Sequence, residues 1–82
     1  MQVEVKLFGH FRQHLPKDAV NGKAVITLPE GATVLRLLDA LGIPFEQDEG
    51  VWMIVVNDEE RFVDTPLKDG DQVSLFPPLP GG

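Results

Sequence analysis

A chain of 82 residues is long enough for one domain with a single small hydrophobic core, and it is too short for two. Its net charge of −6 repels phosphate backbones, so nucleic acid is not an expected partner, whereas a basic protein surface is. The chain has no cysteine, which excludes disulfide bonds. Because it shows neither a bilayer-spanning apolar run nor a signal peptide, we expect a cytoplasmic protein that does not bind membranes.

The first third of the chain is predicted to form a hairpin with a long loop. Apolar and charged residues alternate over residues 3–8, which is the period-two pattern of a strand with one buried face. Residues 9–21 contain a proline and many polar side chains, so we predict a loop there. A second strand is expected over residues 23–28, antiparallel to the first.

A helix is predicted over residues 34–41, where apolar residues recur at helical spacing. Thr33 is placed to cap its first turn, with the side-chain hydroxyl accepting a hydrogen bond from a free backbone amide. Gly42 suits the left-handed position that ends many helices, and Pro44 prevents continuation. The buried stripe is expected to consist of Val34, Leu38 and Leu41, widened by Leu35 and Leu37.

The second half of the chain is predicted to contain an acidic connector and then three strands. The strands are expected at residues 51–56, 61–63 and 72–76, with turns at 57–60 and 69–70. One amphipathic helix on one face of a mixed sheet of four to five strands makes an α+β domain of two layers. We expect the first and last strands to be parallel neighbours near the centre of the sheet.

Two sets of polar side chains were candidates for other sites. His10 and His14 are four residues apart, as metal ligands on a helix can be, but no third ligand accompanies them, so no metal site is expected. Two carboxylate clusters lack the alternating ligands and the glycine of a calcium loop, so we predict that they are solvated surface. These clusters are Glu46, Asp48 and Glu49, and Asp58, Glu59 and Glu60.

The aromatic side chains have two competing interpretations. Phe8, Phe11, Trp52 and Phe62 are expected mainly in the core, where aromatic residues are common. The face of the sheet turned away from the helix could instead carry aromatic side chains as a docking patch. For such a patch Phe76 is the preferred partner-docking anchor, and Phe8 is a second candidate.

We divide the chain into a folded domain over residues 1–76 and an extended tail over residues 77–82. Three prolines in the tail fix φ and remove backbone donors, which disfavours helix and sheet. If extended, the six tail residues reach about 20 Å. Gly81 and Gly82 have no side chains to obstruct a narrow channel, and Gly82 is expected to carry an ionised α-carboxylate. The alternative is a frayed chain end without function.

The closing segment resembles that of the ubiquitin-like sulfur carriers, the MoaD/ThiS family, and most of all its MoaD branch, the small subunit of molybdopterin synthase. The resemblance lies in an Asp-Gly-Asp turn, a Phe-Pro-Pro sequence and a final pair of glycines, at residues 69–71, 76–78 and 81–82. Residues 5–9 and 55–57 are also similar. Leu79 and Pro80 differ from the small or valine-containing pair that is typical of that branch.

This resemblance implies a β-grasp fold and a function for the tail. An ATP-dependent activating enzyme of the MoeB/ThiF type would adenylate Gly82, and a persulfide donor would then supply the sulfur of a C-terminal thiocarboxylate. The tail would enter the MoaE-like large subunit of molybdopterin synthase and donate that sulfur to the pterin precursor. The chain itself would be a co-substrate without catalytic groups or a stably bound cofactor. The residues implied to line the partner's channel are Pro77, Pro78, Leu79, Pro80 and Gly81.

Three alternatives remain open from the sequence. The same carrier chemistry could serve the synthesis of thiamine thiazole, cysteine or a tungsten cofactor. The chain could instead be a ubiquitin-like modifier that forms an isopeptide bond through Gly82 with a lysine of a target protein. Finally, it could be a β-grasp interaction domain in which the two glycines have no chemical role.

Overall fold

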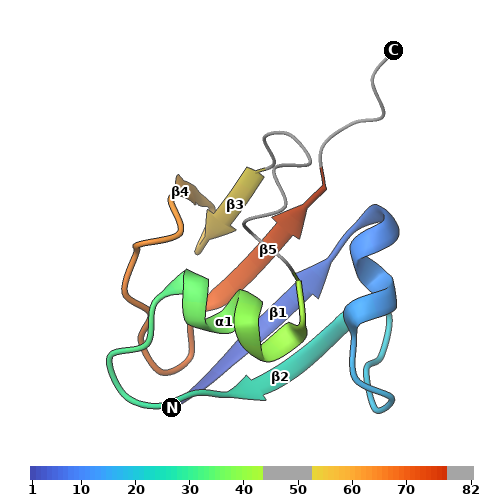
Figure 1. Cartoon of the computed structure of the whole chain (residues 1–82), viewed down its shortest axis with the longest axis horizontal. Helices are drawn as coiled ribbons and strands as arrows, with labels where there is room; N and C mark the ends of the chain where they lie inside the picture. Colours follow the sequence, from blue (N-terminus) through green and yellow to red (C-terminus); the bar gives the residue numbers. More distant parts are fainter. Residues whose placement is uncertain (44–52, 78–82) are drawn as a thin grey trace.

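The computed structural model describes residues 1–43 and 53–77, and it shows one α-helix packed across a five-stranded sheet (Figure 1). These elements confirm the expected α+β architecture with the helix on one face. No helix in the described ranges is long and apolar enough to cross a membrane. In chain order, the elements are β1 (Gln2–Leu7), the 3₁₀ helix η1 (Gly9–His14), β2 (Lys23–Thr27), α1 (Val34–Leu41), β3 (Met53–Val56), β4 (Glu59–Arg61) and β5 (Gln72–Phe76).

The sheet has the strand order β2-β1-β5-β3-β4, so the last strand lies at its centre. β1 and β5 pair in parallel, as expected, and the other three pairings are antiparallel. Because parallel strands end at the same edge, the carboxyl ends of β1 and β5 lie together, and the start of β3 joins them (Figure 1). The chain leaves the sheet at this edge after Phe76.

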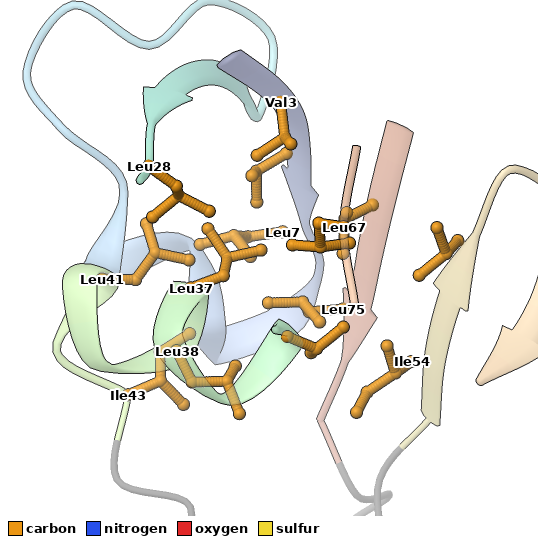
Figure 2. Close-up of a cluster of buried hydrophobic side chains, with 14 of the residues drawn as sticks. Val3, Leu7, Leu28, Leu37, Leu38, Leu41, Ile43, Ile54, Leu67 and Leu75 are labelled. Atoms are coloured by element: carbon orange, nitrogen blue, oxygen red, sulfur yellow. The ribbon is translucent and has the colours of Figure 1, made fainter. Parts of the chain in front are cut away.

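The core fills the space between α1 and the sheet (Figure 2). Alternate residues of the strands point toward the helix, which confirms the period-two pattern of the sequence. From the helix side, Leu37 and Leu38 are fully buried. Each buried leucine contributes roughly 1.5–3 kcal/mol relative to exposure, so this cluster supplies much of the stability of a small domain. The side chains that are almost fully enclosed are Val3, Val5, Leu7, Val34, Leu37, Leu38, Val73 and Leu75.

The two ends of α1 are stabilised in different ways. Thr33 has the extended backbone of a helix cap, but its side chain makes no capping hydrogen bond, contrary to the prediction. The amides of Val34 and Leu35 instead donate to the carbonyl oxygens of Thr65 and Val63, at 3.0 and 2.9 Å. These carbonyl groups pair with two of the free N–H groups of the first turn, which is the role that the hydroxyl group was expected to play.

The carboxyl end of α1 confirms the predicted glycine stop. Gly42 is left-handed, with φ 75° and ψ 20°. Its N–H donates to the carbonyl oxygen of Asp39, and the N–H of Ile43 donates to that of Leu38. This pair of bonds is the Schellman motif, which commonly includes an apolar contact from the residue after the glycine. Ile43 is buried in the core and supplies that contact.

The β3–β4 hairpin differs from the prediction because its turn is shorter. Asn57 and Asp58 both have positive φ, 51° and 70°, so two residues are enough to reverse the chain. β4 therefore begins at Glu59 and ends at Arg61, two residues earlier than expected, and all its side chains are exposed. Phe62 follows the strand and is 78% exposed, so its expected place in the core was wrong.

Two further expectations were corrected. Residues 9–14 form η1 rather than a loop, because Phe11 is buried against the core and its N–H donates to the carbonyl oxygen of Phe8. Leu35 is 45% exposed and does not widen the buried stripe of α1. Its position, one residue after the fully buried Val34, turns it about 100° around the helix axis from that residue.

The Asp-Gly-Asp turn ties the start of β5 to its neighbours. Asp69 Oδ1 accepts a hydrogen bond from the backbone N–H of Gln2 at 2.7 Å. Asp71 accepts two bonds, from the backbone N–H of Lys68 at 2.8 Å and from Asn57 Nδ2 at 2.9 Å. The turn thereby fixes β5 against β1 and against the β3–β4 hairpin, at the end of the strand away from the tail.

Candidate functional site

The face of the sheet turned away from α1 carries an apolar row at the edge where the chain leaves β5. Leu7 pairs with Leu75, so the next residues of the two parallel strands, Phe8 and Phe76, are neighbours. Phe76 also pairs with Met53 of β3, whose side chain is 42% exposed. We call the row of Phe8, Met53 and Phe76 the exit patch.

The two phenylalanine rings of the exit patch stack on each other. Their centroids are 4.2 Å apart and their planes differ by 12°. The N–H of Phe8 donates to the carbonyl oxygen of Leu75 at 3.2 Å, which holds the backbones in register beneath the rings. Both side chains are half-buried, and neither belongs to the helix-side core. The structure therefore places Phe8 on the second sheet face, although the core was the favoured expectation.

The charge beside the exit patch is positive, although the chain as a whole is acidic. Lys6 Nζ lies 5.1 Å from the centroid of the Phe8 ring, within the range of a cation–π contact. Across the strands, Lys6 is opposite Lys23 of β2 and Ser74 of β5. A partner that covers this patch would meet aromatic and thioether groups with an ammonium group at the rim.

Pro77, the first residue of the tail, rests directly on Gly9. A Cβ atom added to Gly9 would lie 2.7 Å from Cγ and 3.4 Å from Cδ of the proline ring. Gly9 also has φ +56°, in the left-handed region that favours glycine. From the sequence, Gly9 was interpreted only as the end of a strand, and no local signal there indicates the contact with a residue so distant in the chain.

The structure brings three of the predicted site residues together, namely Phe8, Phe76 and Pro77. The rest of the predicted tail lies outside the described residues, and so do Trp52 and the carboxylates of the acidic connector. The residues concerned are Pro78, Leu79, Pro80, Gly81 and Gly82, with Glu46, Asp48 and Glu49 in the connector. The partner-docking role of Phe8 and Phe76 therefore stays a prediction, now with a defined geometry.

The two histidines of η1 lie beside the same aromatic ring. The rings of His10 and His14 lie 5.1 and 6.4 Å from that of Phe11, both in edge-on geometry. Within residues 1–43 and 53–77, no group of three or more His, Cys, Asp or Glu side chains could hold a metal ion. The second carboxylate cluster, residues 58–60, is exposed in the β3–β4 hairpin.

Comparison with known families identifies the family of this chain. The model of the ThiS family matches residues 5–82, nearly the whole chain. The chain therefore belongs to the ThiS family, and its five-stranded sheet with one helix is the ubiquitin-like β-grasp fold. The resemblance drawn from the closing segment is confirmed. No curated protein sequence matches the chain.

Solved structures with this fold include proteins of two kinds. A putative molybdopterin converting factor subunit 1 from Pyrococcus furiosus is 35% identical, with a TM-score of 0.69, over 95% of this chain and 98% of that one. A complex of subunits 1 and 2 of the molybdopterin-converting factor from Helicobacter pylori contains a chain 33% identical, with a TM-score of 0.59, matched over the full length of both. SAMP1 from Haloferax volcanii is 27% identical, with a TM-score of 0.74, also over both full lengths.

Proposed function

We propose that this chain is a sulfur carrier whose main-chain carboxyl group at Gly82 becomes a thiocarboxylate and donates sulfur in molybdopterin synthesis. The observation that carries the proposal is the position of the exit patch. The parallel pairing of β1 and β5 sets the stacked Phe8 and Phe76 at the point where Pro77 begins the tail. A partner that grips this patch is therefore placed to receive the tail. Membership of the ThiS family supports the same function.

The chemistry must take place on the backbone, because the chain has no thiol of its own. A carboxylate is a poor electrophile, so an activating enzyme first joins the carboxylate oxygen of Gly82 to the α-phosphate of ATP and releases pyrophosphate. The outer sulfur of a persulfide then attacks the acyl carbon, and AMP leaves. A thiol then attacks the donor's sulfur in the resulting acyl disulfide, which forms a new disulfide on the donor and releases the thiocarboxylate. ATP would thus be consumed by the enzyme and would not be a cofactor of the carrier.

The exit patch would serve each partner in turn. The activating enzyme and the large subunit of a molybdopterin synthase both need the same tail, and the patch at its root is the surface nearest to it. Binding to one partner therefore excludes the other. Pro77, Pro78 and Pro80 would stiffen the tail, and the missing side chains of Gly81 and Gly82 would allow the backbone to approach a reactive group closely.

The pterin is the preferred sulfur acceptor because two similar solved structures belong to molybdopterin-converting factors, at 35% and 33% identity. The Helicobacter structure holds such a subunit together with subunit 2, which supports a large-subunit partner for this chain. Thiamine thiazole, cysteine and tungsten-cofactor synthesis use the same carrier chemistry and differ only in the final acceptor.

The test is the intact mass of the protein purified from its own cells. A thiocarboxylate replaces one oxygen atom by one sulfur atom, and the increase in mass should be lost on mild hydrolysis. Deleting Gly82, or replacing Gly81 with Trp, should abolish adenylation while the circular dichroism spectrum and the urea midpoint stay unchanged. Normal turnover by the shortened chain would contradict the proposal.

A second function is favoured by one specific observation. SAMP1 from Haloferax volcanii, a small archaeal modifier protein, has the higher TM-score, 0.74, and matches the whole chain. In that case Gly82 would form an isopeptide bond with a lysine side chain of a target protein. The same mass spectra separate the two functions, because conjugation yields adducts of much higher mass whereas a thiocarboxylate leaves a single chain.

A further inference from the structure

We propose that Gly9 is a positioning residue for the tail. Because Gly9 has no side chain, the Pro77 ring can pack against its backbone, and this contact, which we call the seat, sets the direction in which the chain leaves β5. Because this role concerns the presentation of Gly82, it rests on the proposed function. Gly9 touches neither ATP nor a reacting atom, so its effect would be exerted wholly through Pro77.

The first support is steric. The shortest separation from a Cβ on Gly9 to the proline ring would be 2.7 Å, a distance that real Cβ contacts essentially never show. Any side chain at residue 9 would therefore push Pro77 away from β1. Since the proline ring is covalently closed, it has little freedom to yield, and the displacement would pass to the backbone at the start of the tail.

The second support is that Gly9 cannot easily retreat. On one side of it, the Phe8 backbone is bonded to Leu75 and the Phe8 ring is stacked on Phe76. On the other side, Phe11 is buried in the core, and its N–H bonds to the carbonyl oxygen of Phe8. The backbone at Gly9 is thus held from both sides in the corner between β1 and η1, so we expect a collision to displace the Pro77 ring.

Displacement of Pro77 should slow the adenylation of Gly82 rather than weaken the binding of the partner. Under the proposed function the partner docks on the exit patch, whose two rings are held by the Phe8–Leu75 hydrogen bond and by their own stacking rather than by Pro77. The carboxylate of Gly82, however, must reach the reactive phosphate in a defined orientation, and a misplacement of about 1 Å can cost on the order of 100-fold in rate. Loss of the seat should therefore lower kcat for adenylation and leave KM nearly unchanged.

A matched control separates the seat from ordinary backbone strain. Gly31 has φ +80°, but a Cβ added there would meet nothing within 4 Å. Gly31→Ala therefore introduces strain from a left-handed backbone without a collision, whereas Gly9→Ala introduces both. Gly31 also lies outside the exit patch, in the turn between β2 and α1.

The experiment measures ATP–pyrophosphate exchange against carrier concentration, using the adenylating enzyme of the same organism that accepts the wild-type chain. Gly9→Ala should lower kcat by about tenfold or more, with KM within about twofold, and Gly31→Ala should leave both unchanged. Gly9→Ala should cause no further loss when Pro77→Ala has already removed the ring, because the two changes act on one contact. The proposal would be overturned if Gly9→Ala lowered kcat as much in the Pro77→Ala background as in the wild type. It would also be overturned if Gly31→Ala lowered kcat as much as Gly9→Ala does.

A second measurement does not depend on enzyme activity. In wild-type protein, nuclear Overhauser effects should connect the Gly9 α-protons to the Pro77 ring protons, and Gly9→Ala should abolish them while those between the Phe8 and Phe76 rings persist. Absence of the Gly9–Pro77 effects in the wild type would refute the seat. If the effects are present but no enzyme adenylates the wild-type chain, the proposed function fails and the seat survives only as a structural contact.

Discussion

Replacing Phe76 with alanine tests the exit patch most directly, because it removes one ring of the stacked pair and keeps the core intact. Phe76 is half-buried on the sheet face away from α1, and its main aromatic partner is the Phe8 ring at 4.2 Å. Stacked aromatic pairs contribute about 0.5–1.5 kcal/mol beyond the area they bury, so the free energy of unfolding should fall by at least about that amount. The domain should remain folded.

The same substitution should also weaken the affinity for the partner. In a bound complex, the Phe76 ring would be fully covered, and truncation of a central aromatic anchor costs about 1–3 kcal/mol. That corresponds to a rise in Kd of about 5- to 150-fold for the activating enzyme. Titration calorimetry with the folded variant measures this value, and urea unfolding followed by circular dichroism measures stability separately.

Phe62→Ala provides the matched control, since it is the same substitution at an exposed ring outside the patch. It should change Kd by less than about twofold, as most surface substitutions do. In the double variant Phe8→Ala and Phe76→Ala, the stability losses should not add, because both report on one stack. An unchanged Kd for Phe76→Ala in a folded protein would show that the exit patch does not dock the partner. An equal rise in Kd for Phe62→Ala would show that the effect is not specific to the exit patch.

Three further substitutions test the scaffold that presents the tail. Leu38→Ala leaves a cavity at a fully buried site and should cost about 2–5 kcal/mol of unfolding free energy, measured as a shift of the urea midpoint. Gly42→Ala forces a Cβ into a left-handed backbone at φ 75° and should lower the free energy of unfolding by about 1 kcal/mol. A calorimetric melting temperature equal to that of the wild type would argue against the role of Gly42 in ending α1. Asp71→Ala removes the acceptor for Lys68 and Asn57 and should cost about 1–2 kcal/mol, and hydrogen exchange that stays slow in the β3–β4 hairpin would contradict this role.

The parts of the fold that follow from short-range patterns were predictable from the sequence. Alternation in β1 and β5, the leucine spacing of α1 and the glycine at its end each depend on residues within one or two turns of the chain. Thr33 shows the limit of that approach. Its hydroxyl was the obvious local cap, but carbonyl groups of residues 63 and 65 occupy that role, and a contact across thirty residues has no signature in the neighbouring sequence.

The same reasoning applies to the candidate site. Phe76 was placed correctly beside the exit point because it immediately precedes the proline-rich tail. The outward facing of Phe8 follows from the alternation of β1, in which Leu7 points to the core, but its pairing with Phe76 depends on the register with β5, which the sequence of β1 does not contain. Gly9 was missed altogether, because a glycine after a strand is an ordinary turn signal. Only the structure shows that Pro77 packs against it.

The parallel pairing of β1 and β5 also determines how the molecule responds to mechanical load. A partner that draws on the tail pulls along the central strand, which is hydrogen-bonded to β1 on one side and to β3 on the other. Force in this direction shears many backbone hydrogen bonds at once instead of peeling them one after another. In the proposed sulfur carrier, the fold should therefore withstand repeated insertion and extraction of the tail, as a chain that is recharged many times requires.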